Sequence, residues 1–336
     1  MLLPGLCLLS LRRLSCACCM RQAAGTLQAL QRSCMLKSLL GYILIGLIKL
    51  VGLTPLKTAQ KLGRGIGWLL WSFRSRAREV ARVNLGLCYP DMAPEQCDRL
   101  LRDALLHSGM TAAEMGPFWG YSQQEGLKLL NKVHGGELLD RALADERGVL
   151  LLIPHQGNWE LTNNFISGQS PITFMYRPLK NQVFNDWMVK RREMLGCNLV
   201  PTTGAGVKRL FEVLQSGGVV GFLPDQEPKR RSGVFVPFMS VPALTPKLPG
   251  ELLRKTGAIA LMVCVVRLPD AQGFDIHISE PPSDIYADDP EVSAAAMNLA
   301  IERCIALCPE QYQWEYKRFK HRPEHALSPY AKAGVP

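Results

Sequence analysis

Acidic residues are absent from the first 78 positions of this 336-residue chain, and Glu79 supplies the first carboxylate. The same stretch holds twelve Lys or Arg residues, and the whole chain carries a formal net charge of +10. A basic, apolar amino-terminal part is typical of a segment that seeks a membrane surface. The net charge favours an anionic partner: a lipid surface, a nucleic acid, an acidic protein or a phosphorylated substrate.

Long apolar runs are scarce as well. One stretch at most could span a bilayer, and the mean hydropathy is only +0.03, which excludes a polytopic membrane protein. Hydrophobic residues nevertheless make up 47% of the chain, so global disorder is excluded and a sizeable core can form. The length allows one large domain or two ordinary ones.

The cysteines show no disulfide framework, because five of the eleven lie in the first 34 residues and the others are scattered. Reduced thiols in a cytosolic domain are the simplest interpretation. Cys16 and Cys19 have a C-x-x-C spacing, but no second Cys or His pair follows at zinc-finger distance. The histidines have no metal-ligand spacing either, so we expect neither a metal nor a cofactor.

The amino-terminal part favours membrane association. Its most apolar stretch, residues 38–56, contains Lys49, and a charge at the centre of a membrane helix costs about 2.5–3.5 kcal/mol on insertion. A second apolar patch, residues 66–71, holds two tryptophans and is followed by arginines, which suits a membrane interface. We therefore interpret residues 35–74 as a membrane-anchoring helical segment, either spanning or lying in the surface; two soluble core helices are the alternative. Residues 1–34 are an uncertain extension. A protein that truly starts at Met35 is slightly favoured over one that has these residues as a real extension.

The hydrophobic pattern of the chain changes near residue 148. Residues 75–147 have mostly helical periodicity, whereas apolar runs of strand length alternate with helical segments from there on. The predicted strands are 149–153, 172–176, 198–200, 219–223, 259–267 and 274–278, and the predicted helices are 207–215, 249–255 and 290–308. This order predicts an α/β fold with an open, largely parallel or mixed sheet flanked by helices. We expect one catalytic domain, 75–325, followed by a tail, 326–336.

The sharpest local feature follows the apolar strand 149–153, where the chain reads Pro154-His-Gln-Gly-Asn-Trp-Glu160. In open α/β sheets, ligands bind just outside the carboxyl ends of the strands. A turn between His155 and Glu160 allows the carboxylate to reach the imidazole, which is the general-base half of a catalytic triad. No G-x-S-x-G accompanies it, so direct deprotonation of a substrate hydroxyl by His155 is favoured. A structural His capped by a neighbour is the equally weighted alternative.

The string HQGNWE is a His-x4-acid motif (HX4E) after a buried strand, and it resembles the late, lauroyl/myristoyl-type acyltransferases of lipid A biosynthesis, within the glycerolipid acyltransferase superfamily. Further blocks similar to that family follow in the expected order, and together the blocks are specific. They are Tyr176-Arg177-Pro178 with Lys180-Asn181, Asp225-Gln226 with 233–238, and 311–314 with 317–320. The resemblance covers about residues 36–323.

The resemblance implies transfer of an acyl chain from an acyl carrier protein, or less commonly acyl-CoA, to a hydroxyl of an acylated, phosphorylated glucosamine disaccharide. His155 is then the base, and Glu160 orients it and stabilises the imidazolium. The family also implies a place at the bacterial inner membrane, with the catalytic domain facing the cytoplasm.

The resemblance gives roles to further polar side chains. Arg177 and Arg192 are expected to bind lipid phosphate or polarise the site. The family also places Asp225 at the site, but its chemistry alone does not assign it a role. Arg192 has a solvated helix face as its alternative, and Asp225 a helix cap. Three neighbouring cations are expected to meet the acidic carrier protein or phosphates, with a membrane-surface patch as an equal alternative: Lys229, Arg230 and Arg231.

Other functions remain open from the sequence. A different acceptor is the first alternative: a lysophospholipid, an ornithine-type lipid or a glycosylated phosphoinositide. A lipid hydrolase would use water in the same site. A non-catalytic protein that binds an anionic membrane or nucleic acid ranks far below, since no nucleic-acid motif accompanies the charge.

Overall fold

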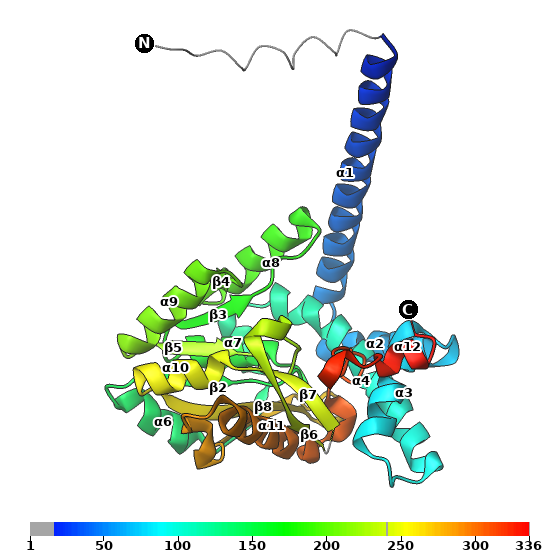
Figure 1. Cartoon of the computed structure of the whole chain (residues 1–336). Helices are drawn as coiled ribbons and strands as arrows, with labels where there is room; N and C mark the ends of the chain where they lie inside the picture. Colours follow the sequence, from blue (N-terminus) through cyan, green and yellow to red (C-terminus); the bar gives the residue numbers. More distant parts are fainter. Residues whose placement is uncertain (1–16, 240, 336) are drawn as a thin grey trace, which may run out of the picture. The chain divides into compact units, whose positions relative to one another are not determined.

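The computed structural model describes residues 17–239 and 241–335, so Cys16 and the first part of the predicted extension lie outside it (Figure 1). Two compact units are distinguished. The first contains the described residues up to Leu47 together with Leu179–Trp187, and the second contains Ile48–Pro178 and Met188 onward. The boundary between a membrane-anchoring segment and a catalytic domain at residue 75 stays a prediction.

The first unit consists mainly of the amino-terminal helix, α1 (Ala17–Gly52), which continues into the second unit. Its part Met35–Gly52 has the length and composition of a membrane span, and only 11% of that window is buried. Leu39 and Tyr42 are among its exposed apolar side chains. This segment is therefore a candidate for membrane association, as predicted from its composition.

In the second unit, α2 (Leu56–Ser72) and α4 (Pro94–Gly120) approach each other closely at glycines. A Cβ atom added to Gly67 would lie 2.3 Å from the carbonyl oxygen of Leu105, and one added to Gly63 would lie 2.6 Å from that of Gly109. Small residues let two helix backbones come together in this way. The first and last glycines of the Gly-x-Gly-x-Gly pattern, Gly63 and Gly67, thus form a helix-packing surface.

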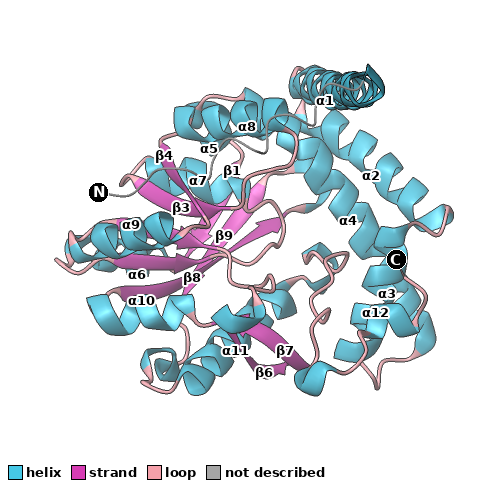
Figure 2. Cartoon of the chain, turned by 45° about the horizontal axis from the view of Figure 1, so that its top comes forward, coloured by secondary structure: helices cyan, strands magenta, loops and turns pink. Residues whose placement is uncertain are grey.

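The core of the second unit is a seven-stranded sheet with the order β1-β9-β8-β2-β5-β3-β4 (Figure 2). All neighbouring strands are parallel except β8 and β9. The strands are β1 (Leu130–His134), β2 (Val149–Leu152), β3 (Ile172–Tyr176), β4 (Cys197–Pro201), β5 (Val219–Phe222), β8 (Ile259–Arg267) and β9 (Phe274–Ser279). The mixed α/β fold is therefore confirmed, and the six predicted strands are all present.

Helices cover both faces of this sheet. Leu150 and Leu152 of β2 pack into one apolar cluster, while Val149 and Leu151 pack into a second on the opposite face. Side chains alternate between the faces of a strand, so a continuous apolar run is what burial on both faces requires. The remaining helices are α3 (Arg76–Cys88), α5 (Gln123–Leu127), α6 (Gly136–Ala144), α7 (Glu160–Ser167), α8 (Gln182–Met194), α9 (Gly204–Gln215), α10 (Leu248–Thr256), α11 (Pro290–Leu307) and α12 (Pro329–Lys332).

Two parts of the fold differ from the prediction. Strand β1 lies inside the stretch 75–147 that was expected to be mostly helical. It is a partly exposed edge strand with only two apolar residues, which gives little apolar signal. A separate antiparallel hairpin, β6 (Gly233–Phe238) and β7 (Val241–Pro246), was not predicted. Its three prolines, Pro237, Pro242 and Pro246, argue against strands in the sequence, but a two-stranded ribbon tolerates them because each strand has an unpaired edge.

Candidate active site

The candidate site begins at the loop that follows β2. Gly157 in this loop has φ +57°, and a Cβ there would lie 2.0 Å from the carbonyl oxygen of Val265. Glycine is therefore required on both counts, conformation and space. The Gly157 N–H donates to the carbonyl oxygen of Gln311 at 3.0 Å, and its own carbonyl accepts from the Thr111 hydroxyl at 3.0 Å. The loop is thus fixed from two sides.

His155 and Asp225 meet at the carboxyl ends of two adjacent parallel strands. Strands β2 and β5 pair with Leu152 opposite Phe222. In each case two residues separate the end of the strand from the polar residue, His155 or Asp225. The distance between His155 Nδ1 and Asp225 Oδ1 is 2.7 Å, and the His155 backbone N–H donates to Asp225 Oδ2 at 2.8 Å. The carboxylate therefore holds both the ring and the backbone of the histidine.

The electrostatics of this pair suit a base. Asp225 is 2% exposed; burial raises the pKa of its carboxyl, but the charge of His155 and the hydrogen bonds from it outweigh burial, so the pKa lies below its usual value. An ionised Asp225 accepts a hydrogen bond from Nδ1–H, and this tautomer has its lone pair on Nε2. Gln226 Nε2 lies 3.3 Å from that nitrogen, and the His155 side chain is 13% exposed. The basic nitrogen is thus positioned but still accessible.

The structure differs from the predicted contact between His155 and Glu160. Both carboxylate oxygens of Glu160, the first residue of α7, bond to Arg192 of α8, with Arg192 Nε 3.2 Å from Oε2. Among the described residues, no hydrogen bond joins Glu160 to His155, because Asp225 already occupies Nδ1. Glu160 is 5% exposed, so Arg192 supplies the charge that a buried carboxylate needs. Arg192 is therefore part of a buried ion pair and does not simply belong to a solvated helix face.

A buried ionic network lies beneath the loop, and sequence reasoning missed it. Arg267, at the end of β8, forms two hydrogen bonds of 2.6 Å with Glu114 of α4. Glu114 also accepts from Asn158 Nδ2 at 3.0 Å, and Arg267 donates to Thr111 Oγ1 at 2.7 Å. The fully buried Glu114 occurs in a helical stretch where its partners, far away in the sequence, give no local signal.

The carboxyl-terminal block contributes backbone contacts to the same loop. The Gln313 N–H donates to the carbonyl oxygen of His155 at 3.0 Å, and Gln226 Nε2 donates to Gln313 Oε1 at 3.3 Å. Glu315 accepts from Ser108 at 2.8 Å; burial raises the pKa of this carboxyl more than Ser108 and the nearby His155 lower it. The predicted blocks around His155, Asp225 and residues 311–314 therefore come together in space.

The other predicted cations lie at different distances from this centre. Arg177 is exposed and follows β3, the neighbour of β5, so it lies at the same edge of the sheet as His155 and Asp225. Arg230 lies over the ring of Phe235, 5.1 Å from its centroid, and donates to a backbone carbonyl. Two flanking cations are exposed on the same turn: Lys229 and Arg231.

One side-chain cluster has the composition of a metal site. The donor atoms of His134, Asp275 and His277 lie within 4.8 Å of one another, because β1 and β9 place the two histidines opposite each other. The prediction that the histidines lack metal-ligand spacing thus holds along the sequence but not in space. A hydrogen bond of 2.9 Å from His134 to Asp275 and stacking of the two rings account for the cluster as a cross-strand contact.

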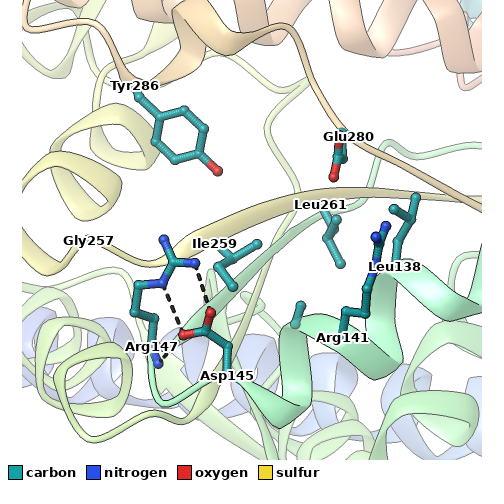
Figure 3. A pocket seen from close by; sticks show the side chains of 10 residues that line it. Leu138, Arg141, Asp145, Arg147, Gly257, Ile259, Leu261, Glu280 and Tyr286 are labelled. Carbon is teal, nitrogen blue, oxygen red and sulfur yellow. Dashed lines mark hydrogen bonds and ion pairs between the residues drawn. The ribbon is translucent and has the colours of Figure 1, made fainter.

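A cavity of about 560 Å³ lies at the amino ends of β2 and β8, the end of the sheet opposite His155 (Figure 3). Figure 3 shows Arg147 bonded to Asp145 in its wall, with Tyr286 and Glu280 across the opening. None of the His155 loop lines it. The loop that contains His155 and this cavity are therefore separate features.

Comparison with known proteins decides the family. A model of the family described as "Bacterial lipid A biosynthesis acyltransferase" matches residues 28–321. The chain belongs to this family. It is therefore an acyltransferase of the lipid A biosynthesis type, as the resemblance of its motifs predicted.

Individual relatives cover most of the chain. The lipid A biosynthesis lauroyltransferase of Escherichia coli K12 is 32% identical over 287 residues, which is 85% of this chain and 93% of the relative. The lipid A biosynthesis palmitoleoyltransferase of the same strain is 32% identical over 263 residues, or 78% of this chain and 85% of the relative. A lipid A biosynthesis acyltransferase of Haemophilus influenzae Rd is 28% identical over 274 residues, or 80% and 86%.

Proposed function

We propose that the protein transfers a fatty acyl chain from an acyl carrier protein to a hydroxyl group of a lipid A precursor, an acylated and phosphorylated glucosamine disaccharide. The observation that carries the proposal is the pair of His155 and Asp225 at the carboxyl edge of the sheet, in a chain of this family. The names of the relatives support the acceptor class, and their different acyl groups leave the chain length open.

In the proposed mechanism, Nε2 of His155 removes the proton of the acceptor hydroxyl as its oxygen attacks the thioester carbonyl. The ionised Asp225 holds the ring through Nδ1–H and stabilises the imidazolium that forms. The C–S bond then breaks, and the imidazolium returns the proton to the leaving thiolate. An ester and a free thiol are produced, and the enzyme returns to its starting state.

Glu160 and Arg192 enter the mechanism as positioning residues. Their ion pair joins the first turn of α7 to α8, and α7 begins five residues after His155 in the chain. Arg192 is 22% exposed and therefore retains a surface that can face a phosphate or the developing oxyanion. Arg177, at the same sheet edge, is proposed to bind a phosphate of the acceptor.

The proposed partners follow from the charge of one exposed turn and from the apolar character of α1. The exposed turn Lys229–Arg231 is proposed to dock the acidic carrier protein, and the apolar α1 to hold the enzyme at the inner membrane with its catalytic domain on the cytoplasmic side. A second acceptor class, another membrane lipid with a free hydroxyl, would use the same chemistry.

The deciding experiment is acyl transfer by the purified full chain with acyl carrier protein donors of several chain lengths and an underacylated lipid A precursor, read by mass spectrometry. We expect one added acyl group and its loss in His155→Ala. Transfer from acyl-CoA but not from the carrier protein would reassign the donor. Full transfer by His155→Ala, with the fold intact by circular dichroism, would overturn the assignment of the base.

A further inference from the structure

A second cavity, of about 510 Å³, lies between α2 and the carboxyl end of β8. Neither His155 nor Asp225 lines it, and the Glu114–Arg267 network stands between it and the catalytic loop. The proposed mechanism gives it no part, so its own composition must indicate what it holds.

Three cations enter this cavity from one face of α2. Lys57, Lys61 and Arg64 follow each other at intervals of four and three residues, which places them one above another on a helix. All three are exposed, and none forms an ion pair with any acidic side chain of the described chain. Positive charge without a bonded acidic partner attracts an anion.

The wall of the cavity adds a neutral donor. Arg267 Nη1 lies 2.9 Å from His107 Nδ1, which therefore accepts, so the ring proton sits on Nε2. Burial, with the charges of Arg267 and Arg64, lowers the pKa of His107 to about 3. The charge of Arg267 itself is offset by Glu114, so the unpaired charge comes from α2.

Two carboxylates, Asp270 and Glu310, also line the cavity, and the three cations of α2 outnumber them. Asp270 is exposed and has φ +53°, a conformation that asparagine adopts readily. The effect of the Asp270 charge on anion binding in the cavity can therefore be tested by Asp270→Asn without disturbing the backbone.

A second exposed face of α2, on the side of the helix away from the cations, indicates what kind of anion is bound. Its exposed side chains there are large and apolar and recur at helical spacing, namely Leu62, Ile66 and Leu69, with Phe73 just after the helix. A helix with a cationic face and a separate exposed apolar face is typical of one that lies in a membrane interface. An anionic lipid of that interface would supply a phosphate to the cations while the apolar face of α2 meets the acyl chains of the bilayer.

We propose that this cavity binds the phosphate of an anionic lipid headgroup, at a site separate from the one that contains His155. The site holds α2 against the membrane with a lipid that need not be a substrate. Its recognition chemistry is that of phosphate with ammonium and guanidinium groups.

The test is site-resolved labelling of lysine amines in the full chain, embedded in phosphatidylcholine nanodiscs. A pulse of acetic anhydride is read by mass spectrometry in plain discs, in discs containing phosphatidylglycerol, and in plain discs with inorganic phosphate. We expect labelling of Lys57 and Lys61 to slow by about fivefold with phosphatidylglycerol, the effect of about one cation's attraction to an anionic surface. Lys208 of α9, which does not line the cavity, is the internal control.

Variants separate a built site from general surface charge. Arg64→Gln should reduce the protection, and Asp270→Asn should increase it. Arg74→Gln is the matched control, because Arg74 is an exposed cation just after α2 that does not line the cavity.

Each outcome decides the proposal. Protection by phosphatidylglycerol alone supports a lipid headgroup, and equal protection by inorganic phosphate supports the same site with a free anion as its ligand. Absence of protection from both, or equal loss of protection in Arg64→Gln and Arg74→Gln, overturns the proposal.

Discussion

At the scale of single residues, the decisive question is which carboxylate assists His155. Glu160 is the acid of the sequence motif, but Asp225 is the acid that bonds the imidazole. The two carboxylates are both buried and have different partners, so their removal should have different consequences.

We expect Asp225→Asn to lower kcat by a factor on the order of 10³–10⁴ with little change in KM, because an amide favours the wrong tautomer of the base. Glu160→Gln should instead act on stability, since it weakens a buried ion pair, and lower the free energy of unfolding by about 1–3 kcal/mol. Steady-state kinetics and chemical denaturation of both variants make the comparison. A Glu160→Gln enzyme that folds normally but loses kcat as severely would contradict the assignment.

A second prediction concerns Gly157. Replacing it with alanine places a Cβ against the carbonyl oxygen of Val265, in a conformation that disfavours any side chain. We expect Gly157→Ala to destabilise the protein by about 1–3 kcal/mol and to reduce acyl transfer even where the fold persists. Gly204→Ala is a suitable control, since nothing lies within 4 Å of its Cβ position; similar losses in both variants would argue against a special role of the loop.

The sequence could have revealed the role of Asp225. The segments Leu150-Leu-Leu-Ile-Pro-His155 and Val220-Gly-Phe-Leu-Pro-Asp225 each consist of a buried strand, a proline and a polar residue at the same offset. Adjacent pairing of the two strands then brings the polar residues together. What no local pattern could show is that β2 and β5 are neighbours, because strand order depends on packing across the whole sheet.

At the scale of elements, the interface between α2 and α4 depends on the absence of side chains. Because a Cβ on Gly67 would meet backbone atoms of α4, Gly67→Ala must push the helices apart. We expect it to lower the free energy of unfolding by about 1–3 kcal/mol through overpacking.

Gly65 on the same helix provides the matched control. Nothing lies within 4 Å of its Cβ position, so Gly65→Ala should stabilise the protein by up to about 1 kcal/mol through helix propensity. Thermal unfolding of the two variants in the same detergent compares them. Equal effects of the same sign would show that the close approach of α2 and α4 has no energetic weight.

Elements differed in how well the sequence predicted them. Strands β2, β5 and β8 are buried on both faces and read as continuous apolar runs, so their positions were predicted almost to the residue. Strand β1 and the hairpin of β6 and β7 are partly exposed or contain proline, and their pairing is decided by distant partners. The sequence therefore predicts a strand well where both of its faces are buried, and poorly at the edges of the sheet.

At the scale of the whole molecule, stability should depend on pH through His107. Its pKa of about 3 in the folded chain lies well below the usual value, so folded His107 stays neutral while the unfolded chain takes up a proton below about pH 6.5. Stability is therefore full above that pH and falls as the pH decreases toward 3, by at most about 1.4 kcal/mol per unit.

His107→Gln should remove this contribution, since an amide can accept from Arg267 without titrating. We expect the difference in unfolding temperature between pH 7.5 and 5.5 to be smaller in the variant than in the parent, measured by differential scanning fluorimetry. An unchanged difference would mean that other groups govern the acid limb.

The register of β2 and β5 has a consequence for how such enzymes diversify. Because main-chain pairing of two neighbouring strands aligns His155 with Asp225, the lengths of the loops in the long stretch of chain between them do not set their distance. That stretch can gain or lose residues, and so remodel the surroundings of the substrate, without misaligning the groups that move the proton. A single residue inserted inside either strand would instead shift one partner to the other face. Selection can thus vary specificity and leave reactivity intact.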